Sequence, residues 1–529
     1  AGEVTVRVWS PHAAAVNLLL RKQQVFVPME RQGDMWVVRL AAGVLKKGEA
    51  YQLAVHTHDG RAFTRRDPWA RATEYATNWC LLDDGGAGFP WKATKEWAPP
   101  TFERYAIYEM QVASFTPEGT FAAATAKLPH IASLGFTAIQ LMPICEHSDL
   151  WGYNPRQLLS LHAAYGSPDE LRTLVDTAHA LGLAVIIDVV LHHGAVEGNS
   201  LWEWDGWSPS FGHGGIYHEG AHDTQWGRGF AFWKREVRDM LYDACAMWLT
   251  DYKCDGLRFD SANDLPRDMT QELTWRLHES HPGRILTAEV TPENPMSVHE
   301  CGFDSVWVHS GYFDIIQQHR ALGRGHHGGG DWAEGWNLPR LRTVMVLHYG
   351  FTSPTQCIKY LLGSHDQIGC SKGGAWYKDY EMVGGRHRYP VDQYGGGRTD
   401  SHATASARLW WTANALAAGI PMMFMGCEWN QGGWWDTSEH RRPQWEQAAD
   451  AEGQAMQECV RRTLALRANY GAVRHGGANV LHEDRANGVV AFERVAEGEA
   501  RVVCVINAGR RSWNQGDYGV WVGGGAFEK

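Results

Sequence analysis

Short apolar segments alternate with longer amphipathic segments from residue 105 onward, and this alternation restricts the fold more than any other feature of the chain. A strand followed by a helix, repeated eight times, predicts a (β/α)8 TIM barrel, with a doubly wound sheet as the alternative. The expected strands cover residues 106–112, 138–142, 184–190, 256–260, 285–289, 305–308, 357–362 and 421–425. The expected helices include residues 169–181, 233–252, 269–280, 339–348 and 403–418.

Two all-β regions are expected on either side of the barrel. Alternating apolar segments separated by turn residues predict an N-terminal β-sandwich over residues 1–98. The barrel is expected over 99–470, with a short inserted loop region at 194–230. Residues 471–529 return to strand patterns and predict a C-terminal β-domain that stops short.

Charge and hydropathy exclude several classes of function. A net charge of −11 without a basic run argues against a nucleic-acid partner. No apolar run reaches the roughly 20 residues that span a bilayer, and no signal-peptide pattern opens the chain. Ten scattered cysteines without a C-x-x-C pair indicate reduced thiols in an intracellular compartment. Twenty-six tryptophans favour a sugar ligand, although most tryptophans in any protein belong to the core.

Arg258 and Asp260 close the fourth expected strand. Residues i and i+2 of a strand point to the same face, so the two side chains would lie together. An arginine beside an aspartate keeps the aspartate ionised, as a carboxylate nucleophile requires. Taken alone, the pair is more typical of an ordinary surface ion pair.

Other expected strands end in residues of the same chemical types. Asp188 ends the third strand, Glu289 ends the fifth, and His365 and Asp366 follow the seventh. Catalytic residues of a barrel stand at the C-terminal ends of its strands. Two carboxyl groups at one site, one ionised and one with a raised pKa, suggest glycoside chemistry, and adjacent strands favour the short separation of a retaining enzyme.

Three other patterns do not develop into a site. The pairs His192-His193 and His326-His327 lack the spacing of metal ligands, which favours loop histidines. Residues 328–330 are three glycines without the Lys and Ser/Thr of a phosphate-binding loop. No G-x-S-x-G nucleophile elbow is present.

The strand-end segments resemble the four motifs of the α-amylase superfamily of glycoside hydrolases and transferases. These segments are DVVLHH at 188–193, GLRFD at 256–260, AE at 288–289 and SHD at 364–366. Within that superfamily the chain is most similar to 1,4-α-glucan branching enzymes. The stretches that carry this closer similarity are 107–115, 140–147, 151–155, 226–232, 364–367 and 424–429.

The resemblance implies a role for each matching residue. Asp260 would be the nucleophile, Glu289 the general acid and base, and Asp366 would stabilise the transition state. Arg258 would orient Asp260, and Tyr153 would stack beneath the sugar ring. The hydroxyl groups of that sugar would be bound by Asp188, His193 and His365.

The resemblance also implies a substrate and a setting. The expected partner is an α-glucan polysaccharide such as glycogen, amylose or amylopectin, and neither a metal nor another cofactor is expected. The N-terminal region would be a glycogen-binding-type module. A monomer in the cytoplasm or the plastid stroma is expected.

Three positions depart from the family pattern. His192 replaces the usual Asn or Ser, so no calcium is expected there, and Gln111 replaces a common His. The segment 261–264 lacks the longer loop that follows the nucleophile in branching enzymes. Two alternatives therefore stay open: an α-1,4-glucan hydrolase of the amylase or maltooligosyltrehalose trehalohydrolase type, and a non-catalytic glucan-binding scaffold.

Overall fold

The computed structural model describes residues 3–210, 212–321, 338–347, 350–369, 387–509 and 511–524. The pair His326-His327, the glycines at 328–330, Cys370 and the end of the expected helix 339–348 lie outside these ranges. The nine described cysteines are free thiols.

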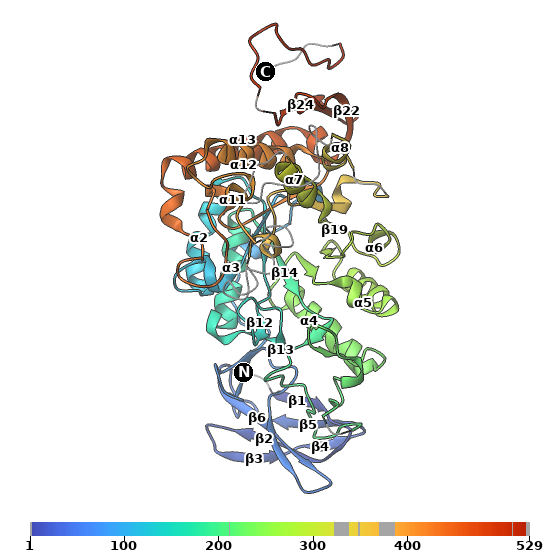
Figure 1. Cartoon of the computed structure of the whole chain (residues 1–529). Helices are drawn as coiled ribbons and strands as arrows, with labels where there is room; N and C mark the ends of the chain where they lie inside the picture. The colour runs from blue at the N-terminus through green and yellow to red at the C-terminus, as the bar shows by residue number, and fades with distance from the viewer. Residues whose placement is uncertain are drawn as a thin grey trace.

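Two antiparallel sheets build the N-terminal region, at the end of the molecule that Figure 1 labels N. One sheet has the order β1-β5-β4, and the other has the order β3-β2-β6-β9-β8 with β7 paired to β6. Buried side chains such as Val8, Leu18 and Leu53 fill this region, as the alternating pattern predicted. The strands are β1 (Val4–Trp9), β2 (Ala13–Leu20), β3 (Val25–Pro28), β4 (Glu30–Gln32), β5 (Met35–Leu40), β6 (Ala50–Thr57), β7 (Ala62–Arg65), β8 (Ala72–Thr73) and β9 (Cys80–Leu81).

Eight parallel strands close into a barrel in the middle of the chain. The last strand pairs with the first, which excludes the doubly wound alternative and confirms the predicted fold. In order around the barrel the strands are β10 (Ile107–Met110), β11 (Ala138–Leu141), β14 (Ala184–Val189), β17 (Gly256–Phe259), β18 (Ile285–Ala288), β19 (Ser305–Val308), β20 (Cys357–Lys359) and β21 (Ile420–Phe424).

The barrel strands are connected by helices and by excursions on the connecting loops (Figure 1). The α-helices are α1 (Val112–Phe115), α2 (Phe121–Ser133), α3 (Pro168–Ala180), α4 (Arg235–Thr250), α5 (Arg267–Ser280), α6 (Met296–His299), α7 (Ser310–Ala321), α8 (Leu338–Met345), α9 (His365–Ile368), α11 (Pro390–Tyr394), α12 (Ser401–Leu416), α13 (Ala451–Asn469) and α14 (Gly471–His475). Two small hairpins pair β12 (Cys145–His147) with β13 (Pro155–Leu161) and β15 (His193–Gly194) with β16 (Arg228–Gly229). A further sheet follows the barrel and consists of β22 (Gly477–Asp484), β23 (Val489–Val495) and β24 (Val502–Asn507).

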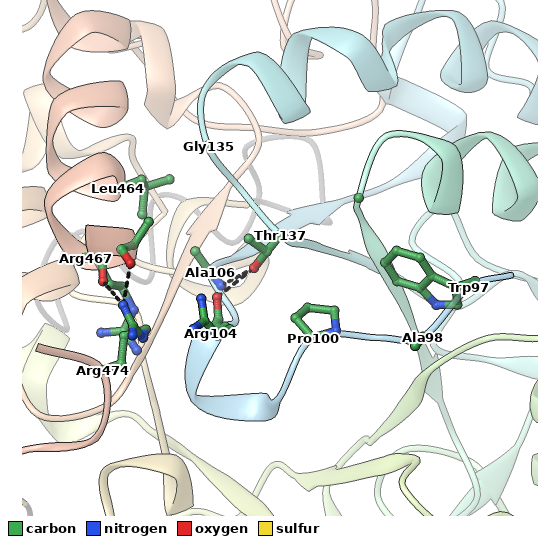
Figure 2. A pocket seen from close by; sticks show the side chains of 12 residues that line it. Trp97, Ala98, Pro100, Arg104, Ala106, Gly135, Thr137, Leu464, Arg467 and Arg474 are labelled. Atoms are coloured by element: carbon green, nitrogen blue, oxygen red, sulfur yellow. Dashed lines mark hydrogen bonds between the residues drawn. The ribbon is translucent and has the colours of Figure 1, made fainter. Parts of the chain in front are cut away.

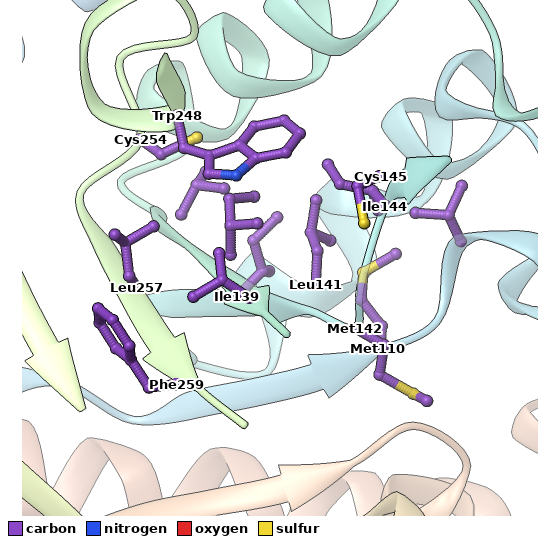
Figure 3. Close-up of a cluster of buried hydrophobic side chains, with 14 of the residues drawn as sticks. Met110, Ile139, Leu141, Met142, Ile144, Cys145, Trp248, Cys254, Leu257 and Phe259 are labelled. Carbon is purple, nitrogen blue, oxygen red and sulfur yellow. The ribbon is translucent and has the colours of Figure 1, made fainter. Parts of the chain in front are cut away.

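Alternation along the barrel strands separates two buried layers. Ile107, Ala184, Ile186 and Trp307 belong to a compact cluster of their own. Their strand neighbours pack instead into the larger core that reaches the surrounding helices. Figure 3 shows part of that larger core, where Leu257 and Phe259 of β17 lie near Trp248 of α4. Side chains of a strand alternate in direction, so every second residue points into the barrel. On this interior face, β14 and β17 begin with small or apolar residues and carry a polar residue near their C-terminal ends.

Buried cations bind the carbonyl ends of several helices. Lys359 donates to the carbonyls of Val344, in the last turn of α8, and of Val346, just beyond its end, both at 2.8 Å. Arg494 of β23 donates to the carbonyls of Leu416 and Ala417 at the end of α12. The last carbonyls of a helix lack intrahelical partners and carry partial negative charge. These cations donate hydrogen bonds to those carbonyls and balance that charge. The contacts of Arg494 also join β23 to the barrel.

Asp255, immediately before β17, is a fully buried hub at the opposite end of the strand from Asp260. Its carboxylate accepts the Val185 backbone N–H at 2.9 Å and the Trp97 indole N–H at 2.9 Å. It also contacts Arg284 at 2.7 Å and the ring of His179 at 3.0 Å. Four partners thus rely on one carboxylate to fix the start of the strand that carries the nucleophile candidate.

We predict that Asp255→Ala lowers the free energy of unfolding by about 2–4 kcal/mol, because it leaves the partly buried cation of Arg284 and the buried N–H of Val185 without their partner. Equilibrium urea unfolding measures the change. Asp34→Ala is the matched control, since Asp34 is exposed and its substitution should change stability by less than about 0.5 kcal/mol. An Asp255 variant as stable as the control would contradict the role of the hub.

Candidate active site

The polar strand ends meet at the C-terminal mouth of the barrel. Asp188 of β14 lies in register with Arg258 of β17, and Arg258 lies in register with Thr287 of β18. Asp260 and Glu289 come one residue after β17 and β18, so parallel pairing brings their backbones side by side. The sequence pattern predicted this convergence from strand position alone.

Arg258 connects the three carboxyl groups. Its Nη1 lies 2.7 Å from an oxygen of Asp188 and 2.9 Å from an oxygen of Asp260, and its Nη2 lies 2.7 Å from Glu289. The guanidinium is fully buried and stacks on the ring of Trp307 at 4.2 Å. The expected ion pair between Arg258 and Asp260 is therefore an internal contact of the barrel, and the surface interpretation was wrong.

Asp260 is the carboxylate best suited to remain ionised. Burial alone would raise its pKa, but the hydrogen bond from His192 at 2.9 Å and the charge of Arg258 together hold the pKa well below its usual range. Its side chain is 13% exposed, so the carboxylate is accessible from the mouth of the barrel. An ionised, accessible carboxylate can act as a nucleophile.

Glu289 has the opposite protonation behaviour. Burial raises its pKa to about 8, and the negative charges of Asp260 and Asp366 add to this effect against the opposing charge of Arg258. The backbone N–H of Ser261 donates to its carboxyl group at 3.1 Å. A carboxyl group that holds its proton at neutral pH can act as a general acid.

Asp366 and His365 approach from the short helix α9. Asp366 is the most open of the three expected catalytic carboxylates, with a side chain that is 45% exposed, and it lies 3.4 Å from the ring of His365. His365 is buried, and its Nδ1 lies 2.7 Å from Glu109 of β10. Burial opposes the charge of His365, but Asp366 and Glu109 raise its pKa to about 9. The ring is therefore an imidazolium at neutral pH.

Tyr153 and His193 complete the walls of the site. The hydroxyl of Tyr153 donates to Asp188 at 2.8 Å, and its ring stacks on His365 with centroids 5.0 Å apart. Burial lowers the pKa of His193 to about 4, so this ring is neutral. Its Nε2 is buried and has no hydrogen-bond partner among the residues that the structure describes. Buried polar atoms without a partner are rare in proteins, and a ligand hydroxyl group would satisfy this one.

All eight residues predicted from the sequence thus belong to one continuous network of contacts. The sequence reasoning did not identify Glu109, which fixes His365, or His309, which lies 3.9 Å from Glu289. It also treated His192 as a loop residue, whereas His192 binds Asp260 directly. A signal for Glu109 was present, because it lies two residues after Ile107 on a strand whose interior face was expected to turn polar toward its C-terminal end.

The departures from the family pattern have specific contacts. Gln111 is buried and donates to the carbonyl of Leu150 at 2.7 Å, which fixes the segment leading to Tyr153. His192 Nδ1 lies 3.7 Å from Asp264 in the short 3-10 turn Ala262–Asp264.

In the described ranges, no group of three or more His, Cys, Asp or Glu side chains is arranged to hold a metal ion. None of the helices in those ranges combines the length and apolar character that crossing a bilayer requires.

Two family models match segments of the chain. Residues 1–70 match the family described as carbohydrate-binding module 48 (isoamylase N-terminal domain). Residues 83–203 match the family described as alpha amylase, catalytic domain.

Two curated relatives cover different shares of the chain. A 1,4-alpha-glucan branching enzyme GlgB of Pseudomonas aeruginosa is 27% identical over 550 aligned positions, which include 95% of this chain and 71% of the relative. A malto-oligosyltrehalose trehalohydrolase of Deinococcus radiodurans is 30% identical over 333 positions, which include 57% of this chain. The alignment spans about half (52%) of the length of that trehalohydrolase.

Solved structures share the fold. A protein of Salmonella typhimurium superposes with a TM-score of 0.75 at 24% identity, covering 96% of this chain and 92% of its own. A pullulanase of Paenibacillus barengoltzii superposes with a TM-score of 0.74 at 20% identity, covering 96% of this chain and 87% of its own. The barrel and the N-terminal β-sandwich thus each contain a segment similar to a known family, the alpha amylase catalytic domain and carbohydrate-binding module 48 respectively.

Proposed function

We propose that the chain is a retaining glucanotransferase that cleaves an α-1,4-glucan and re-attaches the segment through an α-1,6 bond. The observation that carries the proposal is the single guanidinium of Arg258 in contact with Asp188, Asp260 and Glu289. It places an ionised and a protonated carboxyl group side by side. Retaining glycosidases need two such groups about 5–5.5 Å apart.

In the first step, a carboxylate oxygen of Asp260 attacks the anomeric carbon of the donor sugar. The bond from that carbon to the glycosidic oxygen breaks, and Glu289 gives its proton to the departing oxygen. A covalent glycosyl-enzyme intermediate and a shortened chain result. Asp366 stabilises the positive charge that develops on the sugar ring, because it stands open at the mouth beside Glu289.

In the second step, the 6-hydroxyl of another glucan chain attacks the same carbon. Glu289, now ionised, takes the hydroxyl proton, and the bond to Asp260 breaks. Tyr153 supplies a ring surface for the sugar, and the unpartnered Nε2 of His193 accepts or donates to one of its hydroxyl groups. Asp188 and His365 are the remaining hydrogen-bonding groups of this subsite.

Transfer to a glucan is favoured over transfer to water by the extent of the similarity. Branching enzymes align with 95% of this chain, from the N-terminal module to the C-terminal sheet, whereas the trehalohydrolase aligns with 57%. A hydrolase is the second candidate, because the trehalohydrolase has the higher identity in the region that it shares with this chain. A non-catalytic scaffold would not need the opposite protonation states of Asp260 and Glu289.

The proposal has three further parts: the partner, the domain division and the cofactor requirement. The partner is an α-glucan, and the division at 1–98, 99–470 and 471–529 separates the module, the barrel and the C-terminal β-domain. The reaction requires neither a metal ion nor another cofactor. The relatives named above are bacterial, so they give no support to a plastid stroma.

The decisive experiment is linkage analysis of the products formed from amylose. We expect new α-1,6 bonds to appear while the number of reducing ends stays nearly constant, because each cleaved segment is transferred to another chain. Reducing ends that rise without new α-1,6 bonds would instead establish the hydrolase.

Asp260→Asn should lower kcat at least about 10³-fold, because an amide cannot form the glycosyl ester and nucleophile loss removes the covalent route. The fold should be retained, as measured by circular dichroism and by glucan binding. Asp268→Asn is the control, since Asp268 is an exposed residue of α5 away from the site. Turnover by Asp260→Asn at the control's rate would refute the assignment of the nucleophile.

The pH profile of kcat/KM should fall on the alkaline side with a midpoint near pH 8. Raising the pH through the pKa of Glu289, about 8, removes the proton that the leaving oxygen needs. Asp260 stays ionised down to strongly acidic pH, so the acidic limb should lie below the usual aspartate range. Circular dichroism across the same range separates titration from unfolding. A midpoint near 4.5 would show that Glu289 does not hold its proton.

A further inference from the structure

A second pocket lies at the opposite end of the barrel from the candidate active site. Its volume is about 360 Å³, within the range of roughly 300–1,000 Å³ that small-molecule sites occupy. Ala106, Thr137 and Gly182 line it, and each stands one or two residues before a barrel strand. The pocket therefore opens at the N-terminal ends of β10, β11 and β14.

Positive charge is concentrated on one side of this pocket. Arg104, Arg467 and Arg474 line it, and no acidic side chain is among the described residues of its lining. Figure 2 shows the three arginines grouped on one side, away from Trp97. Arginine is the residue that binds phosphate and carboxylate groups in a planar, two-pronged geometry.

Part of this hydrogen-bonding capacity has no partner within the described ranges. Arg467 and Arg474 are 98% and 91% buried, and the Nε atom of each lacks an acceptor there. These Nε atoms are enclosed by protein and do not face the pocket. Both outer nitrogens of Arg467 bind carbonyl groups, so Arg467 contributes its charge to the pocket. Nη1 of Arg474 binds the carbonyls of Arg467 and Ala468, and no acceptor for its Nη2 lies among the described residues. Arg104 is exposed, and its guanidinium forms no hydrogen bond or ion pair with another described residue.

Trp97 provides a fixed ring surface on the other side. Its indole N–H donates to the buried Asp255 at 2.9 Å, and one face of its ring stacks on His179 with centroids 4.6 Å apart. The ring is thus held in one orientation, while its remaining surface lines the pocket beside Pro100 (Figure 2). Ring surfaces of this kind pack against flat or cyclic ligand groups.

We propose that this pocket binds a small organic phosphate, with the phosphate on Arg104 and Arg474 beside the positive charge of Arg467, and the ring of the ligand against Trp97. A nucleoside phosphate and a sugar phosphate share this chemistry. The site is separate from the candidate active site and does not depend on the proposed reaction.

Isothermal titration calorimetry of the whole chain with AMP, glucose 6-phosphate, inorganic phosphate and adenosine tests the proposal. We expect one saturable site for AMP or for glucose 6-phosphate, and which of the two binds more tightly identifies the ring. Inorganic phosphate should bind more weakly, and adenosine should bind weakly or not at all. Absence of saturable binding by both organic phosphates would overturn the proposal, as would adenosine binding as tightly as AMP.

Arg104→Ala should weaken binding of the organic phosphate about tenfold or more, because it removes one charge-assisted contact. Arg104 is exposed and its side chain is not part of the core, so the variant should fold normally. Arg7→Ala, at an exposed position of β1, is the matched control and should bind like the unaltered chain. Equal affinity of the Arg104 variant and the control would overturn the site. Asp260→Asn should retain phosphate binding, so the two proposals can fail independently.

Discussion

The buried guanidinium of Arg258 is the interaction on which the candidate site depends. Taking one cation and three carboxyl groups out of water is costly, and such a cluster persists only when each member is paired. One positive charge cannot balance three negative ones, so the carboxyl groups do not share it equally. Asp260 gains a second partner in His192 and stays ionised, whereas Glu289 keeps its proton. Burial and the shortage of positive charge together therefore leave Glu289 protonated and Asp260 ionised, as the proposed acid and nucleophile require.

The two departures from the family pattern that lie nearest the nucleophile meet in space. His192 contacts Asp260 through Nε2 at 2.9 Å and approaches Asp264 through Nδ1 at 3.7 Å. Asp264 belongs to the short turn after the nucleophile, and Ser261, with a positive φ of 39°, directs the chain into that turn. The unusual histidine and the shortened loop are therefore one local arrangement, in which the loop supplies an acidic neighbour for the ring that binds the nucleophile.

Much of the fold and the site could be predicted because both depend on local patterns. Barrel strands of three to six residues, several of them with a polar residue near or just after the C-terminal end, fix the barrel and place Asp188, Asp260 and Glu289 at one end of it. Side-chain contacts between segments that are distant in the sequence could not be predicted from local patterns. Glu109 and His365 are 256 positions apart, and His192 and Asp260 are 68 apart. Sequence spacing does not determine which way a loop histidine turns, so the direct contact of His192 with the nucleophile needed the structure.

Strand β17 connects the two ends of the barrel through only four residues. Asp255 fixes its start through four partners, and Asp260 follows its end with two. A retaining reaction needs the nucleophile held to within a fraction of an ångström, and a short strand anchored at both ends provides that precision better than a loop. Trp97 donates a hydrogen bond to Asp255 and also lines the pocket at the N-terminal ends of the strands, so that pocket depends on the same buried carboxylate. The rigidity that the proposed reaction requires at one mouth of the barrel thus also fixes a ring surface at the other.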